Sequence, residues 1–247
     1  MDLGVAGRTA IVCGASAGIG LGIAEALAGE GVHVVMLARR REELERQAER
    51  LGALPVVGDV TSADDLERLV RTTAETFGGI DILVNNSAGP PRTRAVGLGA
   101  HQVEAAVELL LISVVRLTAL CLPHLEQSVA GRIVNITSSS VREPIDHLAL
   151  SNLVRPGVIG WAKTLARELG PTGITVNSIA PGRIDTERIR EVYPDGPTED
   201  DLQAIPLRRL GTPREIGDVV AFLCSDRAAY VTGTLLTVDG GLTRGLY

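Results

Sequence analysis

Short apolar, β-branched runs alternate with longer amphipathic runs along the 247 residues of the chain. Strands that alternate with helices in this way form a parallel sheet whose right-handed crossovers place helices on both faces. We therefore predict an α/β fold, namely one doubly wound domain over residues 1–247 with a seven-stranded parallel sheet. The predicted strands are Thr9–Cys13, Val32–Leu37, Leu54–Val57, Ile80–Val84, Ile133–Ile136, Thr175–Ile179 and Leu235–Val238, and the predicted helices span 19–29, 41–51, 62–77, 102–126, 150–169 and 213–224.

The composition narrows the class of function. The chain carries a net charge of -6, and only 2% of its residues are aromatic. Nucleic acids and anionic membranes need a basic face, and base stacking needs aromatic side chains. We therefore expect no nucleic-acid partner and no membrane partner. The apolar stretch 103–122 is interrupted by Glu104 and Arg116, so we expect a buried helix there and not a membrane span.

The first residues and the cysteines bear on the cellular compartment. The chain begins Met1-Asp2-Leu3-Gly4, without the basic and apolar regions of a signal peptide. Its three cysteines are far apart and odd in number, as expected for free buried thiols in a reducing compartment. We therefore expect a cytoplasmic protein. The four histidines show no ligand spacing, so we expect no metal site.

A glycine-rich turn follows the first predicted strand and opens the first predicted helix. In this segment Gly14 permits a tight turn, and Gly18 lets the backbone approach a pyrophosphate. Gly20 allows the helix to pack closely on the strand, and the helix N-terminus presents N–H groups to an anion. A tight turn without a ligand is the alternative, which the position between strand and helix disfavours. The turn predicts a Rossmann-type dinucleotide-binding domain.

Further motifs share the spacing of one enzyme family. Together they resemble the short-chain dehydrogenase/reductase family, and in particular its 3-oxoacyl-carrier-protein reductase-like members. The resemblance covers essentially the whole chain and implies a small-molecule substrate and a homotetramer or homodimer. The motifs are Gly14-x-x-x-Gly18-x-Gly20, Asp59-Val60, Asn85-Asn86-Ser87-Ala88, Pro181-Gly182 with Thr186, Arg209-Leu210-Gly211-Thr212-Pro213, Val231-Thr232-Gly233 and Val238-Asp239-Gly240-Gly241.

The resemblance also implies which residues hold a nicotinamide dinucleotide. Asp59 and Val60 would contact the adenine ring, and Asn85 and Ala88 would line the cofactor cleft. At the other end of the cofactor, the nicotinamide carboxamide would contact Ile184 and Thr186, which follow the sixth predicted strand. The full implied set is Gly14, Ser16, Ala17, Gly18, Ile19, Gly20, Arg39, Arg40, Asp59, Val60, Asn85, Ser87, Ala88, Arg155, Pro181, Gly182, Ile184 and Thr186.

The end of the second strand indicates which cofactor is bound. An acidic residue there would bind the ribose 2′-hydroxyl of NAD(H) and repel a 2′-phosphate. This strand is followed by Arg39, Arg40 and Arg41, with no acid before Glu42. Arginine suits bidentate phosphate contact, so NADP(H) is favoured, with Arg39 as the main contact and Arg40 as helper. A solvated helix start is the alternative, and the apolar Ala17 weakens the NADP(H) interpretation.

The catalytic centre departs from the family pattern. The family uses a Ser, a Tyr, a Lys four residues after the Tyr, and a helix Asn that anchors a water. Ser138 matches the Ser, whereas Ser151 and Arg155 stand at the Tyr and Lys positions, and Leu110 stands at the Asn position. A serine hydroxyl is a much poorer acid than a phenol, and arginine stays protonated and cannot relay a proton. We also expect Pro156 to kink this helix beside Arg155.

Other groups could supply the missing proton. His147 lies on the loop before Ser151, and Tyr193 lies in the segment 183–206, which we predict to be an irregular lid. Water held by Ser138 and Ser151 is a third source. The alternative for His147 and Tyr193 is that both are ordinary loop residues.

Three functions are compatible with these features. The first is an NADP(H)-dependent oxidoreductase of the ketoreductase/dehydrogenase type with a non-standard catalytic centre. The second is a non-redox enzyme on the same scaffold, in which Ser138, Ser151 and Arg155 bind an oxyanion or clamp a substrate carboxylate. The third is a catalytically silent NADP(H)-binding or assembly protein.

Overall fold

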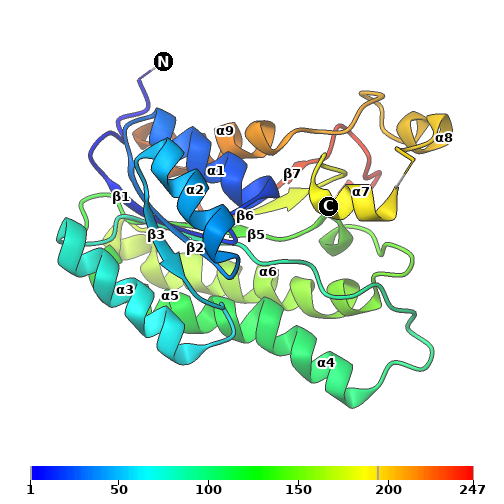
Figure 1. Ribbon diagram of the computed structural model, residues 1–247, viewed down its shortest axis with the longest axis horizontal. Coiled ribbons are helices and arrows are strands. Elements are labelled where there is room, and N and C mark those ends of the chain that lie inside the picture. The colour runs from blue at the N-terminus through cyan, green and yellow to red at the C-terminus, as the bar shows by residue number, and fades with distance from the viewer. Residues whose placement is uncertain (1, 194, 247) are drawn as a thin grey trace.

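The computed structural model describes residues 2–193 and 195–246, and within them the chain forms a 7-stranded parallel sheet (Figure 1). The strand order is β3-β2-β1-β4-β5-β6-β7, which confirms the predicted single doubly wound domain. The order reverses between β1 and β4, and this reversal opens a crevice at the carboxyl ends of the strands. The strands are β1 Thr9–Cys13, β2 His33–Ala38, β3 Leu54–Val57, β4 Ile82–Asn85, β5 Arg132–Ile136, β6 Thr175–Pro181 and β7 Leu235–Val238.

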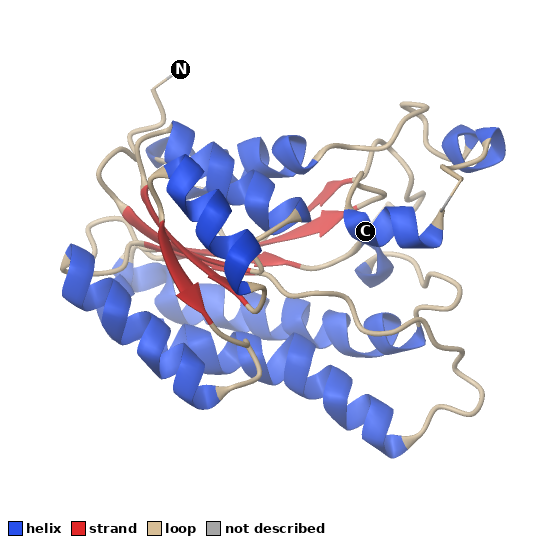
Figure 2. Cartoon of the chain, viewed as in Figure 1, coloured by secondary structure: helices blue, strands red, loops and turns tan. Residues whose placement is uncertain are grey.

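Helices cover both faces of this sheet (Figure 2). The helices α1 (Gly18–Gly29), α2 (Arg41–Leu51) and α9 (Pro213–Cys224) pack on one face, where they share an apolar core with alternate residues of the strands. The other face carries a second core, because successive strand residues point to opposite sides. The helices over this second core are α3 Ala63–Phe77, α5 Ser113–Leu125 and α6 Ala149–Leu169.

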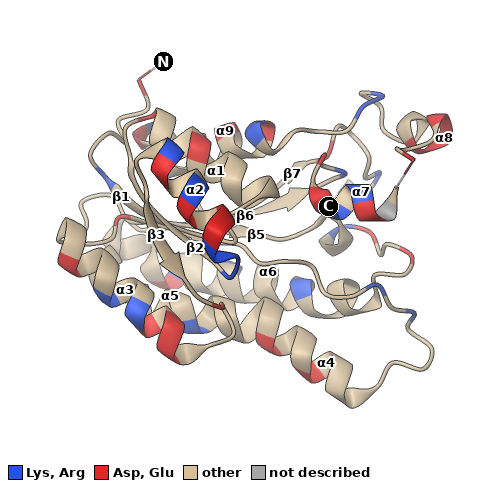
Figure 3. Cartoon of the chain, in the orientation of Figure 1, with Lys and Arg blue, Asp and Glu red and all other residues tan. Residues whose placement is uncertain are grey.

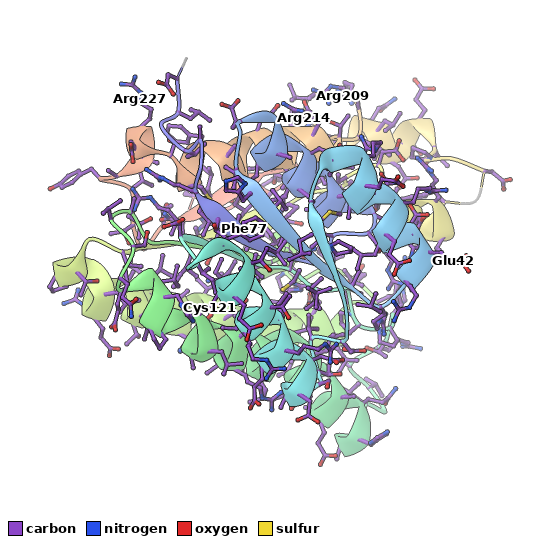
Figure 4. All side chains as sticks on the ribbon, turned by 60° about the vertical axis from the view of Figure 1, so that its left-hand side comes forward. Glu42, Phe77, Cys121, Arg209, Arg214 and Arg227 are labelled. Carbon is purple, nitrogen blue, oxygen red and sulfur yellow. The ribbon has the colours of Figure 1, made fainter. Side chains whose placement is uncertain are left out.

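The predicted helix 102–126 is interrupted in the structure. It consists of α4 (Ala100–Val107), a π-helical turn η1 (Glu108–Ile112) and α5, which carries the buried Cys121 (Figure 4). A π-helical turn inside an α-helix is rare and is frequent near functional sites.

The same apolar segment is less buried than expected. The helical stretch Ala100–Leu125 is long and apolar enough to cross a membrane. Core helices of globular proteins can have the same length and composition. Only 39% of its most apolar window is buried inside the chain, so the prediction of a buried helix is correct only in part. Most other positions of the stretch are half-buried, and Ile112 is exposed.

The predicted irregular lid contains two short helices. These are α7 (Glu187–Val192) and α8 (Glu199–Gln203), so the interpretation of 183–206 as irregular is wrong for these residues. A capping box explains α8, because Thr198 accepts a hydrogen bond from the Asp201 N–H and the Asp201 carboxylate accepts one from the Thr198 N–H. Figure 3 shows the acidic residues of α8. The helix α6 continues through Pro156.

Candidate functional site

A cavity of about 600 Å³ lies at the carboxyl ends of the strands, where the strand order reverses. Loops after six of the strands and the start of α6 contribute its walls, so one space joins the glycine-rich turn to Ser138, Ser151 and Arg155. The predicted site residues that line it are Gly14, Ser16, Ala17, Gly18, Ile19, Gly20, Arg39, Arg40, Asp59, Val60, Ser87, Ala88, Ser138, Ser151, Arg155, Pro181, Gly182, Ile184 and Thr186.

The glycine-rich turn has the geometry of an anion cradle. Gly14 and Gly18 have φ values of 61° and 55°, a backbone conformation that residues with a side chain rarely adopt. A Cβ on Gly20 would lie 2.1 Å from the Gly14 carbonyl oxygen, so the close approach of helix to turn needs glycine. The N-cap residue of α1, Ala17, has no side chain that could cap the first N–H groups. These N–H groups are therefore free for a phosphate, and the residues fit a dinucleotide.

Arginines lie beside the cradle at the end of β2. The Arg39 Nη1 lies 3.6 Å from Asp59 Oδ2, and the Arg39 side chain is 70% exposed. Arg40 donates a hydrogen bond of 3.1 Å to the Glu187 carboxylate, which joins the start of α2 to α7. Exposed ion pairs of this kind contribute little stability, so Arg39 can exchange its carboxylate partner for a ligand at small cost.

Three serines meet at the opposite end of the cavity. Ser138 accepts a hydrogen bond of 3.1 Å from the Ser140 N–H, and the Ser140 and Ser151 hydroxyls lie 3.0 Å apart. Ser140 and Ser151 are both buried, and of these two only Ser151 lines the cavity. When Ser140 donates to Ser151, the Ser151 proton is free to point at a ligand.

Arg155 lies beside these serines and is almost completely buried, with 8% of its surface exposed. Its Nη1 donates a hydrogen bond of 3.2 Å to the Ile136 carbonyl oxygen, and its Nε has no hydrogen-bond partner among the described residues. Burial lowers the pKa of the Arg155 guanidinium to about 10, because desolvation disfavours the charged form. The group still carries its charge at neutral pH.

The position of the missing helix Asn is apolar in space as well as in sequence. Leu110 lies in the π-helical turn and packs with Ala106, Leu150 and Val154 in a small apolar cluster between α4 and α6. The Leu110 side chain itself therefore offers no polar group that could anchor a relay water.

Three predicted residues do not line the cavity. The prediction for Asn85 is wrong in this respect, because its side chain is buried, donates hydrogen bonds to Thr118 and Asn135, and contributes only to a small adjoining void of about 10 Å³. His147 is exposed, has a left-handed backbone with φ of 62°, and does not line the cavity.

The third of these residues is Tyr193, whose hydroxyl donates a hydrogen bond of 3.1 Å to Asp201 Oδ1 within the lid. Partial burial is the main cause that raises the pKa of this phenol. Tyr193 also does not line the cavity.

Asn86 and Ser140 are two of the site residues that sequence reasoning missed. Asn86 lines the cavity and donates a hydrogen bond of 3.0 Å to the Cys13 carbonyl oxygen. This bond connects the loop after β4 to the glycine-rich turn. The Asn85-Asn86 motif contained this signal, but it did not say which of the two side chains faces the crevice. Ser140 was missed because its role depends on contact with Ser151, which is remote in sequence.

The fold and the cavity define a class of protein, a Rossmann-type domain with a phosphate cradle at its switch point. Comparisons with known proteins narrow this class. A family model described as Enoyl-(Acyl carrier protein) reductase matches residues 14–243. "Dehydrogenase/reductase SDR family member 4" of Oryctolagus cuniculus is 35% identical over 244 residues, which cover 96% of this chain and 94% of the relative. The 3-oxoacyl-[acyl-carrier-protein] reductase FabG of Vibrio cholerae is 35% identical over 240 residues, which cover 96% and 97%.

Solved structures of reductases also have a fold similar to that of this chain. L-sorbose reductase from Gluconobacter frateurii, complexed with NADPH and L-sorbose, has a TM-score of 0.91 at 31% identity and covers 100% of both chains. A variant of actinorhodin polyketide ketoreductase with NADPH has a TM-score of 0.89 at 35% identity, with 97% and 98% covered. The chain belongs to the short-chain dehydrogenase/reductase family of oxidoreductases.

Proposed function

We propose that this protein is an NADP(H)-dependent oxidoreductase of the ketoreductase/dehydrogenase type with a non-standard catalytic centre. The observation that carries the proposal is the cavity of about 600 Å³, which joins the glycine cradle to Ser138, Ser151 and Arg155. The NADPH complexes of L-sorbose reductase and of the ketoreductase variant, which share this fold, support it.

The residues that would hold the cofactor follow from the walls of the cavity. The cradle Gly14–Gly20 would take the pyrophosphate, Asp59 and Val60 the adenine end, and Ile184 and Thr186 the carboxamide end. When bound, the nicotinamide supplies the hydride.

The preference for NADP(H) rests on Arg39. It lines the cavity directly after β2, and the chain has no acid before Glu42 that would repel a 2′-phosphate. Its exposed side chain can form the bidentate contacts that phosphate favours, with Arg40 beside it.

The serines would act on the substrate oxygen. Ser138 and Ser151 both line the cavity, and their hydroxyls can donate hydrogen bonds to a carbonyl oxygen. Neither hydroxyl is acidic enough to give up its proton near neutral pH. We therefore assign the proton to bulk solvent, from which a water held between the two serines would relay it to the substrate oxygen. Arg155 keeps its charge and stabilises negative charge that develops on the oxygen.

The double variant Ser151→Tyr/Arg155→Lys tests whether only the acid and its lysine are missing. We expect it to oxidise NADPH with 3-ketoacyl and quinone-like carbonyl substrates about 10²-fold faster than the wild type, because a positioned general acid contributes a factor of this order. The loss of NADPH absorbance measures the rate, and calorimetry checks that both proteins bind NADPH. A folded, NADPH-binding double variant without activity would show that the pocket is not a carbonyl-reductase pocket.

A second candidate function is a catalytically silent cofactor-binding subunit. The apolar surroundings of Leu110 and the Tyr193–Asp201 hydrogen bond favour it, because they remove two routes for a proton. In either case we propose a cytoplasmic homodimer or homotetramer that takes a small-molecule ligand.

A further inference from the structure

The charges that line the cavity do not balance. Four arginines and three acids contribute to its walls among the described residues. Three of the arginines have a carboxylate partner from the same walls. The pairs are Arg39–Asp59 at 3.6 Å, Arg40–Glu187 at 3.1 Å and Arg188–Glu191 at 3.2 Å.

Arg155 is the fourth arginine, and no described carboxylate lies within 4.0 Å of it. The three paired arginines are about half exposed or more, so water screens their charge, whereas Arg155 is 8% exposed. A buried charge without a partner is costly, and such groups are normally paired. The protein therefore holds one uncompensated positive charge in the wall of its ligand cavity.

The donors around Arg155 complete a set that matches a carboxylate. Ser138 and Ser151 line the cavity beside it, and each has a hydroxyl proton that can point inward. A carboxylate accepts several hydrogen bonds on two oxygens, and a guanidinium binds it strongly because both groups are charged. Ser140 touches no cavity surface but lies 3.0 Å from the Ser151 hydroxyl, which it can orient.

We propose that Ser138, Ser151 and Arg155 also bind the carboxylate of a small organic acid, next to the carbonyl oxygen on which they would act, with Ser140 as a positioning residue. The substrate class is therefore oxo acids and the corresponding hydroxy acids. The inference rests on the proposed function in one respect, since it places this carboxylate in the substrate part of the cavity that the cofactor would share.

Matched acids and amides test the subsite. The probes are acetoacetate with acetoacetamide and 3-phenylpropionate with 3-phenylpropionamide, titrated calorimetrically into the full chain with and without saturating NADP⁺. We expect the wild type to bind each carboxylate at least tenfold more tightly than its amide, which corresponds to about 1.4 kcal/mol. Arg155→Met should reduce this ratio to about one, and Arg155→Lys should keep part of it.

Two further variants separate charge pairing from general damage. Arg188→Met removes a cavity arginine that already has a carboxylate partner, so the wild-type ratio should persist. Ser140→Ala should lower the carboxylate-to-amide ratio several-fold, and Ser140→Thr should restore it, which a merely structural role would not produce.

The wild-type ratio is decisive even where a variant fails to fold. Equal affinity of the wild type for acid and amide would overturn the subsite. An Arg155→Met variant that keeps the full wild-type preference for the acid would overturn it as well. Because these titrations are read without cofactor as well, a protein that binds carboxylates but not NADPH would refute the proposed function and leave the subsite standing.

Discussion

At the scale of single residues, arginine has two different roles in one cavity. Arg39 is exposed, pairs loosely with Asp59 and can exchange this partner for a phosphate. Arg155 is buried, holds the Ile136 carbonyl oxygen and has no carboxylate partner among the described residues. The sequence pattern predicted both positions, but only the structure shows the difference in burial, because burial depends on how β5 and α6 pack.

The substitution Arg39→Asp tests the basis of cofactor choice. It should weaken NADPH binding at least tenfold and leave NADH binding equal or stronger, because the new carboxylate repels the 2′-phosphate and can accept from a ribose hydroxyl. Arg41→Asp is the matched control, since Arg41 pairs with Glu45 and does not line the cavity. Titration calorimetry gives both affinities. An unchanged affinity ratio in Arg39→Asp would remove Arg39 from the site.

At the scale of elements, the apolar periodicity predicted the strands and the long helices to within a few residues. It could not place Asn85, because a shift of one position at a strand end turns a side chain from the crevice into the core. It also hid α7 and α8, because short helices have too few turns for an amphipathic pattern. The Thr198–Asp201 capping box was a usable signal for α8.

Thr212 and Glu215 form a second capping box at the start of α9. Arg209, which is labelled in Figure 4, donates hydrogen bonds to the Glu215 carboxylate. The hydrogen bonds from Arg209, and then those from Thr212, lower the pKa of the Glu215 carboxyl from 4.5 to about 2. The folded-state pKa is below the unfolded one, so this contribution to stability is fully present above about pH 4.5. It is lost as the pH falls through about 2.

Glu215→Gln therefore should lower the melting temperature at neutral pH and have no effect below about pH 2. We expect a decrease of no more than about 3 °C, because solvent screens this exposed pair and glutamine keeps a capping oxygen. Thermal unfolding of both proteins across the pH range measures the difference, and high salt serves as the control because it screens the pair. A difference that stays constant down to pH 2.5 would contradict the assignment.

At the scale of the whole molecule, the helical layer of α4, α5 and α6 leaves apolar surface open. Ile112 in η1 and Leu153 in α6 are 37% and 56% exposed. Burial of such a face between copies of the chain would remove it from water. The sequence could not show this surface, because its apolar pattern is the same for a core helix and for an interface helix.

Leu153→Asp should break an assembly built on this face. We expect the wild type to sediment as a dimer or tetramer and the variant to show at most half that mass, because a charge at an apolar interface is costly to bury. Analytical ultracentrifugation measures the mass. Val129→Asp is the control, since Val129 is exposed but lies in the turn between α5 and β5. A wild type that sediments as a monomer at micromolar concentration would contradict the assembly.

We propose that the cavity between the glycine cradle and Arg155 binds a nicotinamide dinucleotide and prefers NADP(H). Calorimetric titration of the wild-type protein with NADPH and, in parallel, with NADH tests it most directly. We expect NADPH to bind in the micromolar range and NADH clearly more weakly. The chemistry at Ser138 and Ser151 is then tested with the double variant. Binding of neither nucleotide would contradict the account, because the cleft would then have lost its cofactor together with its tyrosine.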